Sequence, residues 1–274
     1  TCWQIGVTTS SNIFFQGHSL LLSFFRKSKS LIKDPVLRRW VFNFALGKFD
    51  RPKIIGSRPS YLRGLSINKA NSRPKKPVDM VDYSFPRTKF SQEFAGELVE
   101  IDPNKTLTIG MFSDVESKMA FHRFSWLNEP ATEVDISWVV KLWSHWVSEY
   151  GSNHLGLAWQ TYTTAERLIN LVKFFVDNGF PSSQPDTISI LSKHGQYIFD
   201  NLEYYGPSHT GNHFVNNGRC LYIAGVLLGV ESWINVGREI IINESKTLFN
   251  TTGEHREGSV HYHLLITSWY LECW

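Results

Sequence analysis

The chain has 274 residues, of which 42% are hydrophobic and 19% are charged. This balance excludes a disordered chain and a fibrous one, and it leaves room for one large domain or two modest ones. With 28 Lys and Arg against 25 Asp and Glu, the net charge of +3 is too weak to argue for nucleic acid, but it is compatible with a modestly anionic substrate.

The N-terminal stretch carries two apolar patches, Leu20–Phe25 and Val36–Leu46, which predict short helices. Ser19–Phe25 is followed rather than preceded by basic residues, which is the wrong order for a signal peptide. No run of about 18 apolar residues exists, so we expect no membrane span. The chain begins without Met and ends inside an apolar helical pattern, and we therefore expect it to be a fragment of a longer protein.

The amino-acid composition changes after residue 50. Proline is so frequent between Arg51 and Pro86 that a long helix is excluded, and we expect an extended basic connector. Residues 88–125 look strand-like. Within them, Glu97–Ile101 and Thr106–Ile109 alternate in polarity, with a turn predicted at Asp102–Asn104.

From Asp135 onward the periodicity is helical. Six helices are predicted: 139–150 before Gly151, 163–178 opened by a Thr163/Glu166 capping box, 188–205 before Gly206, 213–229, 233–249 and 259–274. Short polar loops between them favour antiparallel neighbours. We therefore predict a mainly α fold, an incomplete (α/α) toroid of helical hairpins over residues 115–274, preceded by a small mixed or irregular region over residues 1–114.

Three constellations could carry chemistry. The first is Trp159–Arg167, in which two aromatic residues precede a cation that the dipole of an opening helix does not favour. An anionic partner would explain that cation, and a surface salt bridge with Glu166 or Asp177 is the plainer alternative. The 10 Trp, 10 Tyr and 19 Phe of the chain serve equally well for stacking on sugar rings and for a large helical core.

The second constellation is Ser208–Arg219, which gathers two histidines, three asparagines and an arginine. Helix capping by Thr210 or Asn212 accounts for part of it, but not for His209, His213 and the rest. The third is Gly253–His263, with three histidines and two glutamates. Zinc binding is a minority interpretation, because positions i and i+2 of a helix do not share a face.

The order of these motifs resembles the N-terminal helical domain of the heparinase II/III family of polysaccharide lyases. The matching residues are Asp135, Trp138 and Leu142-Trp143; Trp159, Tyr162 and Arg167; Asn212-His213, Asn217 and Arg219–Leu221; and Gly253, His255, Glu257, Ser259, Tyr262 and His263. Gly258, Val260 and His261 depart from the family pattern but leave the tyrosine in place.

The resemblance implies β-elimination on a uronic-acid polysaccharide, with no metal or other cofactor. Asn212, assisted by His213, would neutralise the carboxylate, and Tyr262 would serve as base, acid or both. Arg167 would bind a carboxylate or sulfate, and Trp159 and Tyr162 would stack on sugar rings. His209, Glu257 and His263 are assigned to the substrate site with them.

The resemblance also implies a C-terminal β-sandwich domain that follows the toroid and supplies a further histidine, and a periplasmic or extracellular location. Two alternatives stay open: a glycoside hydrolase, for which Asp200, Glu203, Glu254 and Glu257 offer carboxylates, and a non-catalytic carbohydrate-binding protein. Nucleic-acid binding through residues 51–77 is disfavoured, because no aromatic residues interleave with the basic run.

Overall fold

The computed structural model describes residues 35–46, 58–65, 74–84, 86–105, 109–128, 135–152, 154, 156–182, 186–206 and 210–274. The chain divides into two compact units, Thr1–Ser57 with Tyr204–Thr210 and Arg58–Glu203 with Gly211–Trp274, and each is described by itself. In the first unit, α2 (Pro35–Ala45) confirms the helix predicted at 36–46. The helix predicted at Leu20–Phe25 lies outside the described residues.

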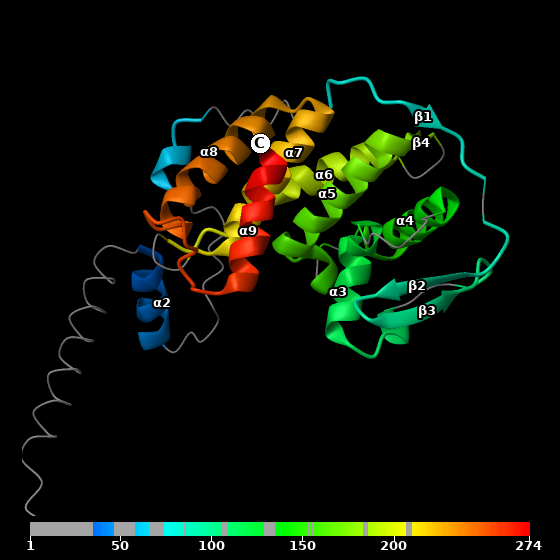
Figure 1. Cartoon of the computed structure of the whole chain (residues 1–274), viewed down its shortest axis with the longest axis horizontal. Helices are drawn as coiled ribbons and strands as arrows, with labels where there is room; N and C mark the ends of the chain where they lie inside the picture. Colours follow the sequence, from blue (N-terminus) through cyan, green and yellow to red (C-terminus); the bar gives the residue numbers. More distant parts are fainter. Residues whose placement is uncertain are drawn as a thin grey trace, which may run out of the picture. The chain divides into compact units, whose positions relative to one another are not determined.

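The second unit is mainly helical, which confirms the predicted fold class (Figure 1). Its elements are η1 (Ser60–Leu62), β1 (Met80–Val81), β2 (Phe90–Phe94), β3 (Glu97–Ile101), η3 (Ile109–Met111), α3 (Val115–Arg123), η4 (Ser125–Asn128), α4 (Ile136–Tyr150), η5 (Leu157–Trp159), α5 (Thr161–Asn178), β4 (Phe180–Pro181), α6 (Thr187–Asp200), α7 (Asn212–Leu228), α8 (Glu231–Leu248) and α9 (Val260–Cys273). None of the helices that the structure describes is long and apolar enough to cross a bilayer. The toroid closure and the division at residue 114 stay predictions.

The strand region differs from the prediction. Strand β3 pairs with β2 in an antiparallel hairpin. Of the strand predicted at 106–109, residues 106–108 lie outside the described residues, and Ile109 begins η3. Ala95 and Gly96, at φ 49° and 89°, form the two-residue turn that suits such a hairpin. Within the range that looked strand-like, helix α3 forms instead, because the Asp114 side chain accepts a hydrogen bond from the Glu116 amide and caps its start.

Two helix ends also differ from the prediction. Helix α5 begins at Thr161, and Thr163 is buried with its hydroxyl 3.8 Å from the Met119 sulfur, so it does not cap the helix. Helix α6 ends at Asp200 rather than at residue 205. At this end the side-chain amide of Asn201 donates to the Tyr197 carbonyl (2.8 Å), and the chain leaves the helix after it.

Helices α7 and α8 pack as an unusually close pair, because glycine faces backbone on both sides. A Cβ built on Gly237 of α8 would lie 2.4 Å from the Tyr222 nitrogen and 2.6 Å from the Gly218 carbonyl oxygen, both on α7. A Cβ on Gly218 would lie 2.5 Å from Ile240. The pair thus forms a tight antiparallel hairpin that supports the helices beside it.

Helices α5, α7 and α9 run in the same direction. The Tyr162 ring of α5 lies 4.6 Å from the His213 ring of α7, and one turn further along Glu166 pairs with Arg219. Arg219 in turn pairs with Glu272 and lies over the Trp269 ring of α9. Along α5 and α9 the contacts run from Tyr162 with Trp269 to Lys173 with Glu272. The order of contacts therefore rises along all three helices, and they run in parallel. Figure 1 shows α7 and α9 side by side, and they are in contact.

Candidate active site

Four of the residues that the sequence singled out for chemistry lie in the first turns of these three helices. Tyr162 is the second residue of α5, Asn212 and His213 open α7, and Tyr262 is the third residue of α9. Asn212 and Tyr262 are 50 residues apart, as are Arg219 and Trp269, which are in contact on the same two helices. The offset therefore places Tyr262 near the level of the first turn of α7.

A second observation joins these two helix starts. The loop before α9 reaches the start of α7, since an Nη of Arg256 lies 3.8 Å from the position that a Cβ on Gly211 would occupy. Three helix N-termini directed toward one region give that region a positive potential and favour a bound anion. The guanidinium of Arg256 adds to it.

His213 is held from two sides. Its Nδ1 lies 3.1 Å from Oε1 of Glu203, and its ring packs against Tyr162. The guanidinium of Arg123, on α3, lies over the Tyr162 ring, 5.2 Å from its centroid. Burial first, and the Glu166 carboxylate next, raise the pKa of the Tyr162 phenol. Tyr162 is therefore a protonated hydrogen-bond donor at neutral pH.

Tyr262 projects from the first turn of α9. The Ser259 side chain accepts a hydrogen bond from the Tyr262 amide and caps the helix, and Gly258 adopts φ 65°, a conformation that suits glycine. The Tyr262 side chain is 40% exposed. Gly258 differs from the family pattern, but the helix that follows it is still capped and exposes Tyr262 at its surface.

His255 lies beneath this turn. It is 3% exposed, and its ring stacks on Tyr262 at a centroid distance of 6.4 Å. Its Nδ1 accepts from the Glu257 amide, while its Nε2 has no hydrogen-bond partner among the described residues; the same is true of the Asn212 Oδ1 atom. Burial lowers the pKa of His255. Two buried polar atoms near the helix starts thus lack a hydrogen-bond partner among the described residues, which is uncommon in folded proteins.

Trp159 and Arg167 lie elsewhere, inside the core. The Trp159 ring is 3% exposed and is covered by His194 on one side and His154 on the other, at 4.7 and 4.0 Å. The structure therefore corrects the assignment of Trp159 as a sugar platform. Most of the tryptophans of the described residues serve the helical core, as with Trp126, Trp138, Trp143, Trp146 and Trp233.

Arg167 is fully buried and cannot reach a sugar in this conformation. Its Nε donates to His194 Nε2 (3.0 Å), and one Nη donates to the carbonyls of His122 (2.9 Å) and Ala158 (2.8 Å). Its guanidinium lies 3.9 Å from the Trp146 ring centroid. The guanidinium is therefore not at the surface, where a salt bridge with Glu166 or Asp177 was the plainer alternative. It joins α3, η5, α5 and α6 instead.

The remaining assigned residues are placed as follows. Glu257 is exposed on the loop before α9, and His263 is half-buried, with its Nδ1 accepting from the His255 amide (3.3 Å). His209 lies outside the described residues. Within the part of the chain that the structure describes, no three His, Cys, Asp or Glu side chains are gathered to hold a metal.

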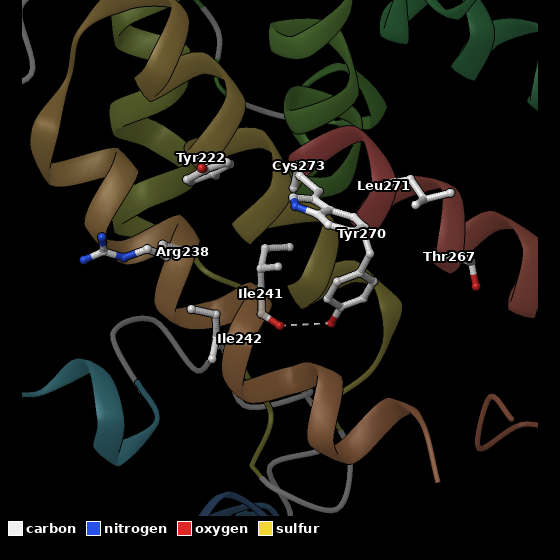
Figure 2. Close-up of a pocket in the computed structure, with 9 residues that line it drawn as sticks. Tyr222, Arg238, Ile241, Ile242, Thr267, Tyr270, Leu271 and Cys273 are labelled. Carbon is white, nitrogen blue, oxygen red and sulfur yellow. Dashed lines mark hydrogen bonds between the residues drawn. The ribbon is translucent and has the colours of Figure 1, made fainter. Parts of the chain in front are cut away.

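A separate hollow of about 470 Å³ lies between α7, α8 and the second half of α9. Figure 2 shows its lining, including Ile241, whose carbonyl accepts from the Tyr270 hydroxyl (3.1 Å). The lining is apolar apart from Arg238 and a few polar tips. It does not offer the hydrogen-bonding groups that a charged sugar requires.

Three residues of the site escaped the sequence assignment of substrate-binding groups. Glu203 binds both Asn217 and His213, and the ring of His255 stacks on Tyr262. Asn217 and His255 stood within the motifs that resembled the family. Glu203 stood in a predicted helix and was considered only as a carboxylate for the hydrolase alternative.

The comparisons with known proteins agree with the geometry. The sequence model described as Heparinase II/III N-terminus matches residues 16–273. No curated protein and no solved structure matches the chain.

Proposed function

Because the chain belongs to the heparinase II/III family and corresponds to the N-terminal portion of its members, we propose that it cleaves a uronic-acid-containing polysaccharide by β-elimination. The reaction removes the proton at C5, next to the sugar carboxylate, and expels the oxygen at C4. It needs a group that neutralises the carboxylate, a base for the proton and an acid for the leaving oxygen.

The common start of α5, α7 and α9 is the observation that carries the proposal. Negative charge grows on the sugar carboxylate as the proton leaves, and three helix N-termini favour that charge. Asn212 in the first turn of α7 is the neutralising group, since an amide can donate without carrying a full charge that would retain the product. Arg256 replaces Arg167 as the cation for an acidic group of the substrate.

Tyr262 transfers the proton. Its phenol is exposed at the surface of α9, near the level of Asn212, and a phenol hydroxyl can accept or donate a proton. His213 lies between Tyr162 and Glu203 and supplies a second titratable group at the same end. Tyr162 contributes a hydrogen-bond donor and an aromatic edge for the sugar. His209, Glu257 and His263 stay assigned to substrate binding, as the resemblance implies.

We place this unit beside a C-terminal β-sandwich domain that completes the site with a further histidine, and we place the protein in the periplasm or outside the cell. Both follow from the resemblance to the family. The polysaccharide itself is heparan-like or another uronate polymer.

A glycoside hydrolase on the same helices is the alternative from another class. It needs two free carboxylates flanking the bond. Glu203 is bound by His213 and Asn217, and the Oε2 atom of Glu254 accepts from Asn250 and Thr252, so both carboxylates are already engaged in hydrogen bonds. These contacts favour the lyase over the hydrolase.

The test is to incubate the full-length protein with a panel of uronate polysaccharides and follow ultraviolet absorbance. Elimination leaves an unsaturated uronate that absorbs, whereas hydrolysis leaves a saturated sugar that does not. Absorbing product on one polymer supports the proposal. New reducing ends without absorbance would favour the hydrolase, and saccharide binding without any product would favour a non-catalytic binding protein.

A further inference from the structure

We propose that Glu203 is a positioning residue that holds His213 in the tautomer with a proton on Nδ1 and a free lone pair on Nε2. The inference rests on the proposed function for its catalytic meaning, but its structural content can be tested without any activity. Glu203 comes from the segment after α6, and His213 from the first turn of α7.

The carboxylate of Glu203 is itself held in place. Its Oε2 accepts from Asn217 Nδ2 (3.2 Å), and its backbone amide donates to Asn217 Oδ1 (2.9 Å). Both polar atoms of the Asn217 amide are thus used, and Asn217 is fully buried on α7. The second carboxylate oxygen, Oε1, is thereby directed at His213, 3.1 Å from Nδ1.

The tautomer follows from the chemistry of the two partners. An ionised carboxylate only accepts hydrogen bonds, so Nδ1 of His213 must be the donor. The neutral ring then carries its lone pair on Nε2. The Glu203 side chain is 14% exposed and that of His213 is 61% exposed, so the contact anchors the ring at one nitrogen while the rest of it faces solvent.

The surrounding groups keep the ring in this orientation. Tyr162 of α5 packs on one face, with Arg123 of α3 on the far side of Tyr162, and Arg256 reaches the start of α7. None of these three side chains is a carboxylate that could compete for Nδ1. Glu203 therefore fixes the ring both sterically and by tautomer, as an outer carboxylate does for a catalytic histidine.

The first measurement is the nitrogen-15 NMR spectrum of the histidine side chains at pH 8, with His213 assigned by its loss in His213→Gln. We expect His213 to be protonated at Nδ1 in the unmodified protein and to shift toward the Nε2-protonated form in Glu203→Ala. An Nε2-protonated His213 in the unmodified protein would overturn the proposal, and so would a tautomer unaffected by Glu203→Ala. The unmodified spectrum needs no variant, so the proposal stays falsifiable if Glu203→Ala does not fold.

The second measurement is kinetic and uses the polysaccharide that gives absorbing product. We expect Glu203→Ala to lower kcat about 100-fold with little change in KM, because the ring is misoriented for proton transfer. Glu244→Gln is the matched control: this buried carboxylate accepts from the Tyr61 hydroxyl (2.6 Å), far from His213 in sequence. Equal losses in both variants would overturn the positioning role. The expected tautomer change without any lyase product would overturn the proposed function alone.

Discussion

Arg219 on α7 and Glu272 on α9 form an ion pair that fixes the register of the two helices. The Nε atom of Arg219 donates to Glu272, and its Nη1 donates to Glu166 of α5 (3.0 Å). One buried guanidinium thus joins the three parallel helices whose starts form the candidate site. Burial alone would raise the pKa of the Glu272 carboxyl, but the hydrogen bond and the charge of Arg219 lower this pKa.

Replacing Arg219 by Ala should therefore destabilise the unit and loosen α9. The partly buried Glu166 loses this ion pair, and Glu272 keeps only Lys173 as its partner among the described residues. Breaking a buried ion pair costs about 3 kcal/mol. Chemical denaturation followed by tryptophan fluorescence measures the loss. Arg238→Ala is the control, since Arg238 is exposed on α8 and bonds only to Asn235 among the described residues. Equal stability of the two variants would contradict the role given to Arg219.

Replacing Arg167 has a different expected effect, because its hydrogen-bond partners are neutral. Arg167→Met fills the space but leaves His194 Nε2 and the carbonyls of His122 and Ala158 without a donor. Each unsatisfied buried group costs about 1–3 kcal/mol, so we expect a loss of at least about 3 kcal/mol in the free energy of unfolding. Arg167→Lys should not restore it, because an ammonium cannot reproduce the planar fork.

The measurement that separates this account from direct substrate binding is saccharide affinity. A variant that still folds should bind the polysaccharide as tightly as the unmodified protein, since Arg167 lies in the core. A folded Arg167→Met protein that is stable but has lost affinity would show that the guanidinium reaches the substrate.

Two buried histidines make stability depend on pH. Burial first, and the charge of Arg167 next, lower the pKa of His122 to about 3, and the same causes lower the pKa of His194 well below its ordinary 6.5. Below pH 6.5 the unfolded chain binds protons that the folded protein does not. The contribution of these histidines is thus complete above pH 6.5, and it falls as the pH decreases from there toward the folded pKa.

We expect the free energy of unfolding to fall by about 1.4 kcal/mol per pH unit for each such histidine. Urea unfolding between pH 7 and 5 measures this before most carboxylates titrate. His122→Asn keeps an acceptor for the Trp146 indole, which donates to His122 Nδ1 (3.1 Å), and it should remove one histidine's share of the slope. An unchanged slope in that variant would contradict the assignment.

The helices beyond residue 135 could be predicted because apolar spacing and capping residues act locally. Asp135 caps α4, Ser259 caps α9, and Gly229 ends α7 at φ 73°, and these helix ends all lie within three residues of the predicted ones. The sequence could not choose the partner of Glu97–Ile101, since pairing is a contact between segments. Nor could it show that Asn201 stops α6.

The candidate site, like the fold, could be predicted from the sequence only in part. Asn212, His213 and Tyr262 could be recognised from a motif, and the fold brings their helix starts to one end. The role of Arg167 could not be read from its place in the first turns of a helix, because burial depends on η5, α3 and α6 closing around it. Glu203 was equally out of reach, since its partners become neighbours only when the chain leaves α6 and begins α7.

The most direct test of the central claim compares Tyr262→Phe and Asn212→Ala with the unmodified protein, using absorbance of the unsaturated product. Tyr262→Phe removes a single oxygen from an exposed side chain, so its stability should be unchanged while kcat falls about 100-fold or more. Asn212→Ala should cause a similar loss. Thr267→Ser is the control, because Thr267 lies on the same helix as Tyr262, five residues further along, and lines the separate apolar hollow. Unchanged turnover in Tyr262→Phe would contradict the account.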